Sequence, residues 1–283
     1  MAIVKVHDDF DLKKIADSGQ CFRAKEVETG LFRFITGNKV IYIRQVDEFD
    51  FDITCHEGDW DRFWIKYFDL DTSYWAIRRD IFQYSEITPF RDYLKAATEF
   101  GKGIRILRQE PFETLISFII SQRKNIPSIK KSVELICEGF GEIIHSPFEE
   151  LRAFPTPEKL SAATTLGLSN CALGYRGAYV RDAIEKVRTH VVDLEDMVYS
   201  KDDELLFELR EIKGVGEKIA NCVALYAYHR LNLSPVDVWI KRAIEEDFNG
   251  RNIFAEFGTF AGVLQQYIFY YTRLGQKEFD LVD

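Results

Sequence analysis

The chain has 283 residues, of which 46% are hydrophobic, 14% aromatic and 29% charged, a composition typical of a globular protein. No apolar run is long enough to span a bilayer, and the first residues, MAIVKVHDDF, lack the apolar core of a secretory signal. We therefore expect a soluble, intracellular protein. The net charge of −9 weakly disfavours a nucleic-acid partner, although binding depends on where the basic groups lie rather than on their sum.

The five cysteines are widely scattered along the chain, and none stands in a C-x-x-C pair. An odd number without close spacing argues against a disulfide framework, a zinc site and a four-cysteine iron–sulfur cluster. We therefore predict no metal ion and no cofactor.

The first hundred residues have mainly the pattern of β structure. Leu31–Ile35 and Val40–Arg44 are rich in aromatic and β-branched residues, and turn-forming residues 36–39 separate them. This pattern predicts a β-hairpin. A similar turn at residues 28–30 follows a predicted strand at Gln20–Val27, so we expect a small antiparallel sheet.

From about residue 60 the hydrophobic period changes to that of helices. Pro111 opens one helix, since apolar residues recur after it at steps of three and four and proline suits the first helical turn. Another helix follows Gly174, with an apolar stripe that reaches Val191, and a long aromatic helix covers Phe260–Arg273. The predicted fold class is α+β, with a β-rich N-terminal part merged with a larger helical part.

Residues 203–222, DELLFELREIKGVGEKIANC, contain two apolar stripes separated by Lys213, Gly214, Val215 and Gly216. This pattern predicts two short helices joined by a G-V-G turn. Glycine lets the main chain touch a ligand closely, and the unpaired N–H groups at a helix start favour a phosphate. The alternative is an ordinary helical hairpin whose glycines only turn the chain; the two stripes, with Lys218 just inside the second helix, favour DNA binding.

Lys218 and Asp237 are the candidate catalytic residues. The positive end of a helix and partial burial both favour the neutral amine of Lys218, which is a nucleophile able to form a Schiff base with a sugar carbon. Asp237 lies 19 residues further on, where Pro235 blocks helix continuation and a carboxylate can cap the next helix. The same carboxylate can stabilise positive charge on a sugar ring. A surface lysine and a simple capping aspartate are the ordinary alternatives.

The hairpin, the lysine in G-V-G-E-K and the aspartate in P-V-D-V together resemble the helix–hairpin–helix DNA glycosylases. Segments beginning at Ser18 (SGQCFR), Gly103 (GIRILRQEP) and Leu173 (LGYRGAYV) resemble the 8-oxoguanine DNA glycosylase/AP lyase branch, in a bacterial or archaeal variant. The resemblance implies a small N-terminal antiparallel β domain at residues 1–98. It also implies a larger all-α glycosylase domain at residues 99–283, with the hairpin at 203–228 and the catalytic aspartate loop at 234–239.

The resemblance also implies roles for single residues. Lys218 would be the nucleophile, Asp237 would stabilise the sugar, and the Gly19 carbonyl would accept the N7 hydrogen that distinguishes 8-oxoguanine from guanine. The base pocket would be formed by Gly19, Cys222, Gln265 and Phe269. DNA would be contacted by Arg123, Asn125, Tyr175, Arg176, Gly214, Val215, Gly216 and Trp239. For Cys222 a small buried hydrophobe, for Phe269 a plain core residue and for Tyr175 a locally packed aromatic are the alternatives.

The sequence departs from the eukaryotic pattern of this family at several positions. Lys213 replaces a hairpin proline, Trp239 a phosphate-contacting histidine, and Arg123 and Lys124 two asparagines. Ser128 stands where the family has an arginine that hydrogen-bonds the opposite cytosine. Since such a bidentate contact contributes about 1–3 kcal/mol of discrimination, we predict a relaxed preference for the opposite base.

The implied reaction flips the lesion out of duplex DNA, releases 8-oxoguanine through a Schiff base on Lys218, and cuts the strand by β-elimination. Two alternatives remain open: a relative that acts on oxidised pyrimidines or alkylated purines, and a non-catalytic DNA-binding module. The expected partner is duplex DNA that contains 8-oxoguanine. We also expect a monomer without membrane contact, in the cytoplasm and nucleoid of a prokaryote or the nucleus of a eukaryote.

Overall fold

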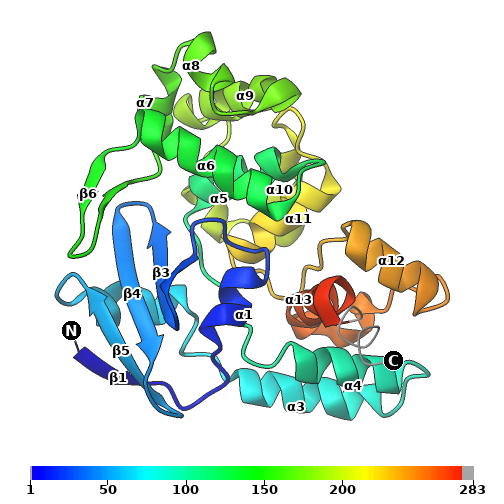
Figure 1. Cartoon of the computed structure of the whole chain (residues 1–283). Helices are drawn as coiled ribbons and strands as arrows, with labels where there is room; N and C mark the ends of the chain where they lie inside the picture. The colour runs from blue at the N-terminus through cyan, green and yellow to red at the C-terminus, as the bar shows by residue number, and fades with distance from the viewer. Residues whose placement is uncertain (1, 276–283) are drawn as a thin grey trace.

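The computed structural model describes residues 2–275, in which an antiparallel sheet lies beside a larger group of helices (Figure 1). The sheet has five strands in the order β1-β5-β4-β3-β2. The strands are β1 (Ala2–Lys5), β2 (Lys25–Glu28), β3 (Leu31–Thr36), β4 (Lys39–Gln45) and β5 (Asp50–Cys55). A separate ribbon pairs β6 (Ile143–His145) with β7 (Glu150–Arg152). The α+β class is therefore confirmed.

The predicted hairpin is confirmed, because β3 and β4 pair in register from Leu31 opposite Arg44 to Thr36 opposite Lys39. The predicted strand at Gln20–Val27 is wrong in its first half, since β2 begins only at residue 25. Gln20 is buried, and its side-chain amide donates to the Ser18 hydroxyl and to a distant main-chain carbonyl. Residues 18–24 therefore form a loop, which we call the Gly19 loop.

Thirteen α-helices lie within residues 2–275. They are α1 (Leu12–Asp17), α2 (Ile65–Tyr67), α3 (Tyr74–Ser85), α4 (Arg91–Phe100), α5 (Pro111–Ser121), α6 (Ile126–Phe140), α7 (Pro157–Ser161), α8 (Thr165–Ser169), α9 (Gly177–Arg188), α10 (Asp202–Arg210), α11 (Glu217–Tyr226), α12 (Val238–Glu246) and α13 (Ala261–Tyr270). Shorter 3₁₀ and π turns include η2 (Gly174–Arg176) and η5 (Tyr271–Gly275). None of the described helices is both long and apolar enough to cross a membrane.

Helix α5 begins at Pro111, as predicted. The carboxylate of Glu110 caps it by accepting the N–H groups of Phe112 and Glu113. The helix predicted after Gly174 is α9, but it ends at residue 188, so the exposed Val191 lies outside its apolar stripe. The predicted aromatic helix is α13, continued by η5.

Two large buried clusters form the core of the described chain. One lies between the sheet and α1, and the other joins the helices and includes Tyr74, Ile77, Leu94 and Ala97 from α3 and α4. These two helices thus pack with the helical part, whereas the division at residue 98 remains a prediction. Phe22 packs in the helical cluster while the flanking residues 21 and 24 pack in the sheet cluster. The Gly19 loop therefore runs between the two clusters.

Glu113 links the two parts of the chain from the first turn of α5. Its carboxylate accepts the main-chain N–H of Gly37, in the β3–β4 turn, at 3.1 Å. Burial raises the pKa of Glu113 to about 7; the positive charge of Arg23 opposes this shift, and the negative charges of Glu110 and Glu134 add to it. Near neutral pH this carboxyl group is therefore part protonated.

Candidate active site

A cavity of about 660 Å³ opens where the Gly19 loop, the α5–α6 loop and the first turns of α11 and α12 meet the end of α13. This volume lies in the range of small-molecule sites. The predicted site residues that line it are Gly19, Arg123, Asn125, Lys218, Asp237, Trp239 and Phe269. The fold thus brings together residues that lie up to 250 positions apart in the sequence.

Lys218 and Asp237 both line this cavity at helix starts. Lys218 is half-buried in the first turn of α11, with its Nζ 5.2 Å from the ring centroid of Phe118. Asp237 caps α12, and its Oδ1 accepts the N–H groups of Trp239 at 3.0 Å and Ile240 at 2.9 Å. Within residues 2–275, Oδ2 makes no hydrogen bond. The cap therefore holds the carboxylate while one oxygen remains available to a ligand.

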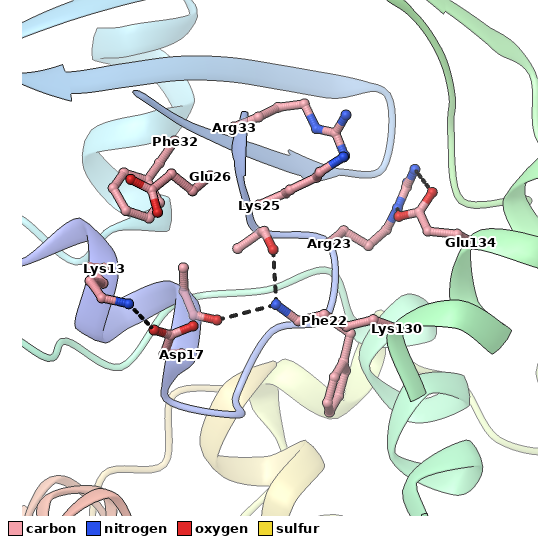
Figure 2. Close-up of a pocket in the computed structure, with 12 residues that line it drawn as sticks. Lys13, Asp17, Phe22, Arg23, Lys25, Glu26, Phe32, Arg33, Lys130 and Glu134 are labelled. Carbon is pink, nitrogen blue, oxygen red and sulfur yellow. Dashed lines mark hydrogen bonds and ion pairs between the residues drawn. The ribbon is translucent and has the colours of Figure 1, made fainter. Parts of the chain in front are cut away.

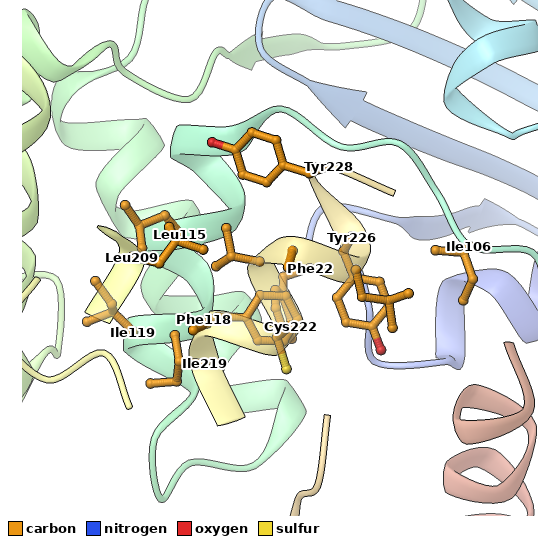
Figure 3. Close-up of a cluster of buried hydrophobic side chains, with 14 of the residues drawn as sticks. Phe22, Ile106, Leu115, Phe118, Ile119, Leu209, Ile219, Cys222, Tyr226 and Tyr228 are labelled. Carbon is orange, nitrogen blue, oxygen red and sulfur yellow. The ribbon is translucent and has the colours of Figure 1, made fainter. Parts of the chain in front are cut away.

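Burial sets the electrostatic state of the groups around Lys218. It raises the pKa of Asp237, while two N–H donors and the charge of Lys218 oppose the shift. It also raises the pKa of Cys222 to about 11, again opposed by Lys218. Cys222 is therefore an uncharged thiol one turn from Lys218, packed in the apolar cluster with Phe118 and Ile219 that Figure 3 shows.

The predicted helical hairpin is formed by α10 and α11, joined through the G-V-G turn. Gly214 has φ +83°, and a Cβ on it would overlap the ring of Tyr179. Val215 is buried, whereas a Cβ on Gly216 would meet nothing within 4 Å. Gly214 is thus needed for packing, and Gly216 leaves the start of α11 open to a ligand.

The main chain of the Gly19 loop is held by side chains on both sides of Gly19. The Ser18 carbonyl accepts from Gln266 Nε2 at 2.7 Å, and the Gln20 carbonyl accepts from Gln109 Nε2 at 2.8 Å. Across the described chain, no hydrogen bond reaches the carbonyl between them. The Gly19 carbonyl is therefore an acceptor that remains available to a ligand between two tethered neighbours.

Lys130 on α6 joins the last turn of α1 to the end of the Gly19 loop. Its Nζ donates to the carbonyls of Ala24 at 3.0 Å and Ala16 at 3.5 Å, and Figure 2 shows the Lys130 amine with two dashed interactions. Beside it, Arg23 from the loop pairs with Glu134 of α6 at 3.0 Å. These contacts fix the loop against the helix that follows the cavity.

Gly19 also contacts the aromatic side of the cavity. Its φ is +78°, and a Cβ built on it would lie 3.2 Å from Ile126 Cδ1 and 3.3 Å from Phe269 Cε1. Phe269 thus lies directly beside the Gly19 main chain. The space beside this ring can stack a flat base while the adjacent carbonyl accepts a hydrogen bond from it.

Two predicted base contacts lie behind the cavity rather than on its lining. Cys222 and Gln265 are both buried. The Gln265 Oε1 has no hydrogen-bond partner among residues 2–275. The base contacts of both residues remain predictions.

The predicted DNA-contacting loops are tied to each other. Arg176 is buried and donates from Nε to the Gln122 carbonyl at 2.7 Å, while Lys124 Nζ donates to the Ala172 carbonyl at 2.8 Å. Arg123, with φ +50°, and Tyr175, which is 53% exposed, project from these loops. Arg176 therefore positions the Arg123 loop in this structure, and its predicted contact with DNA remains a prediction.

Two cations at the cavity were not singled out from the sequence: Lys241 and Arg273. With Arg123, Lys124 and Lys218 they make five basic residues, against one acidic residue, Asp237, among the described residues that line the cavity. No local motif marks these two, because they come from separate helices, α12 and η5. The cavity is thus locally basic in a chain of net charge −9.

Comparison with known proteins identifies the family of this chain. The 8-oxoguanine DNA glycosylase N-terminal domain matches residues 2–115. The structure of MBOgg1 in complex with a low-affinity DNA ligand is 35% identical, with a TM-score of 0.90 over 97% of this chain and 96% of that one. The chain belongs to the 8-oxoguanine DNA glycosylase family.

Two further relatives agree with this family assignment. The apo form of Clostridium acetobutylicum 8-oxoguanine glycosylase/lyase is 35% identical, with a TM-score of 0.85 over 95% of each chain. An N-glycosylase/DNA lyase of Saccharomyces cerevisiae is 34% identical over 199 residues, or 65% of this glycosylase-family chain. That match spans 50% of the yeast protein.

Proposed function

We propose that this chain is a bifunctional DNA glycosylase/AP lyase that removes 8-oxoguanine from duplex DNA. The proposal rests on two features that lie at the same cavity. One is the Gly19 carbonyl, left as a single acceptor between two tethered neighbours and beside the Phe269 ring. The other is Lys218 and Asp237 at the same cavity. The first suits a flat base that carries an N7 hydrogen, and the second suits attack on its sugar.

In the proposed reaction the damaged nucleotide leaves the helix and enters the cavity. Lys218 Nζ attacks C1′ while Asp237 Oδ2 stabilises the positive charge that develops on the sugar ring, and the bond from C1′ to the base breaks. Opening of the ring gives a Schiff base on Lys218. β-Elimination then breaks the strand on the 3′ side.

Arg123, Lys124 and Lys241, which line the cavity, support binding of the phosphates on either side of the flipped nucleotide. The open space beside Gly216 at the start of α11 lets an anion approach the main chain of the hairpin. Tyr175 would fill the hole left by the base, since it is the exposed aromatic residue of the tied loops. The proposed partner is therefore duplex DNA, and the enzyme would act in the compartment that contains the DNA.

Opposite-base preference is expected to be relaxed. Ser128 cannot provide a guanidinium fork, and the buried Arg176 is engaged with the Gln122 carbonyl. Excision rates with each of the four bases opposite the lesion test this expectation. Similar rates agree with it, and strong selectivity for cytosine contradicts it.

The proposed function is tested by product analysis on matched duplexes that carry 8-oxoguanine or guanine at one position. Release of free 8-oxoguanine with strand cleavage, and no release of guanine, supports the proposal. Release of an oxidised pyrimidine or alkylated purine instead would support the superfamily alternative. Binding without any release would support a non-catalytic module.

A further inference from the structure

Arg273 is a cation at the base pocket for which the proposed reaction has no role. It lies in η5, one helical turn after Phe269, and lines the same cavity as Lys218 and Asp237. Its guanidinium carbon lies 5.2 Å from the Phe269 ring centroid. Its Nη2 also donates a hydrogen bond to the Asp17 carbonyl.

These two contacts connect the two sides of the base pocket. Asp17 ends α1 and precedes Gly19 by two residues, so the Arg273 bond holds the chain as it enters the Gly19 loop. The Arg273 guanidinium lies over the Phe269 ring, two carbons of which would lie within 3.4 Å of a Cβ on Gly19. One planar side chain therefore constrains both the ring and the carbonyl beside it.

We infer that Arg273 is a positioning residue that sets the spacing between the Phe269 ring and the Gly19 carbonyl, and so tunes selection of the oxidised base. The inference rests on the proposed function, because it assigns the pocket to a flipped base. A guanidinium can stack and donate in its own plane at the same time, which an ammonium cannot.

The unpaired Nε of Arg273 supports a positional role. This atom is buried and has no hydrogen-bond partner among the described residues. An unpaired buried donor is unfavourable, so the stack and the Asp17 bond hold the side chain in place against that cost. The buried Nε is closed to a ligand, and the contacts with Phe269 and the Asp17 carbonyl let Arg273 act on the ring and the loop.

A purely electrostatic role is the main alternative, since Arg273 and Asp237 each favour the charged form of the other. Arg273→Lys separates the two roles because it keeps the charge and loses the planar stack. Arg273→Met removes both. Arg242→Met is the matched control, since Arg242 is an exposed arginine on α12 whose ion-pair partner is Glu246, one turn further on.

Each variant is assayed on two duplexes, one with 8-oxoguanine and one with a preformed abasic site, which has no base to position. We expect Arg273→Met and Arg273→Lys to excise 8-oxoguanine at least about tenfold more slowly and to cleave the abasic strand within about twofold of the parent rate. Arg242→Met should match the parent on both substrates.

Three results would overturn the inference: full excision by Arg273→Met, full rescue by Arg273→Lys, or an equal loss on both substrates. Thermal unfolding of each variant identifies an equal loss that comes from misfolding, and a position needed only for folding also contradicts the inference. If the parent protein releases no 8-oxoguanine, the proposed function itself fails. If the parent excises 8-oxoguanine and the Arg273 variants excise it equally well, only the inference about Arg273 fails.

Discussion

Gly19→Ala tests the geometry of the base pocket most sharply. The new Cβ would lie 3.2 Å from Ile126 Cδ1 and 3.3 and 3.4 Å from two carbons of Phe269, inside the usual separation of about 3.5–4.0 Å. The substitution therefore adds a methyl group at the junction of the carbonyl and the ring. To accept it, the ring or the loop has to move by a few tenths of an ångström.

The size of the effect follows from backbone strain and this contact. At φ +78° an L-residue costs about 1–2 kcal/mol, so the free energy of unfolding should fall by about that amount. If moving the ring or the loop raises the free energy of the transition state for excision by the same amount of about 1–2 kcal/mol, the rate falls about 5- to 30-fold. Cleavage of an abasic strand should change little because that reaction needs no base contact.

The matched control is Gly30→Ala. Gly30 has φ +74° in the turn between β2 and β3, and a Cβ there would meet nothing within 4 Å. Both alanine variants should therefore lose similar stability in denaturant titrations, while only Gly19→Ala loses excision. Wild-type excision by Gly19→Ala, or an equal loss in Gly30→Ala, would show that the contact of Gly19 with Phe269 does not control excision.

Three further changes test separate parts of the structure. The parent protein should lose stability as the pH rises from about 4.5 to 7, because the pKa of Glu113 is raised to about 7 in the folded state. Glu113→Gln lacks this loss, so its free energy of unfolding should gain up to about 3 kcal/mol over that of the parent between pH 5 and pH 8. Denaturant unfolding measures the difference. An unchanged difference would contradict this. Asp237→Asn should keep the melting temperature, because asparagine caps helices equally well, yet lower excision about 100-fold; a large fall in melting temperature would show a mainly structural role. Gly214→Ala should lower stability by about 2–4 kcal/mol through its overlap with Tyr179, whereas Gly216→Ala should change stability little; equal melting temperatures would contradict the packing argument.

The elements that the sequence predicted correctly have strong local signals. The β3–β4 hairpin has turn residues between β-branched segments, and α5 has a proline at its start. Strand β5 was missed because its acidic residues obscured the alternation that buries Phe51 and Ile53. Strand β1 is short, and Ile3 within it is 60% exposed, so its four residues carry little hydrophobic pattern.

Lys218 and Asp237 were predictable from the sequence because both are chemically reactive residue types at predicted helix starts, with a separation typical of the family. The side chains that hold the Gly19 loop were not predictable, because each joins residues far apart: Gln266 lies 248 positions from Ser18, and Arg273 lies 256 positions from Asp17. No periodicity or turn signal reports such contacts. Only the packing of α13 against the loop brings them together.

The proposed reaction requires the amine of Lys218 to form the covalent bond to the sugar. Borohydride reduction during reaction with an 8-oxoguanine duplex, followed by peptide mapping of the cross-linked protein, tests it directly. We expect one adduct, located on Lys218 and absent from Lys218→Gln. An adduct on another residue, or trapping that persists in Lys218→Gln, would contradict it.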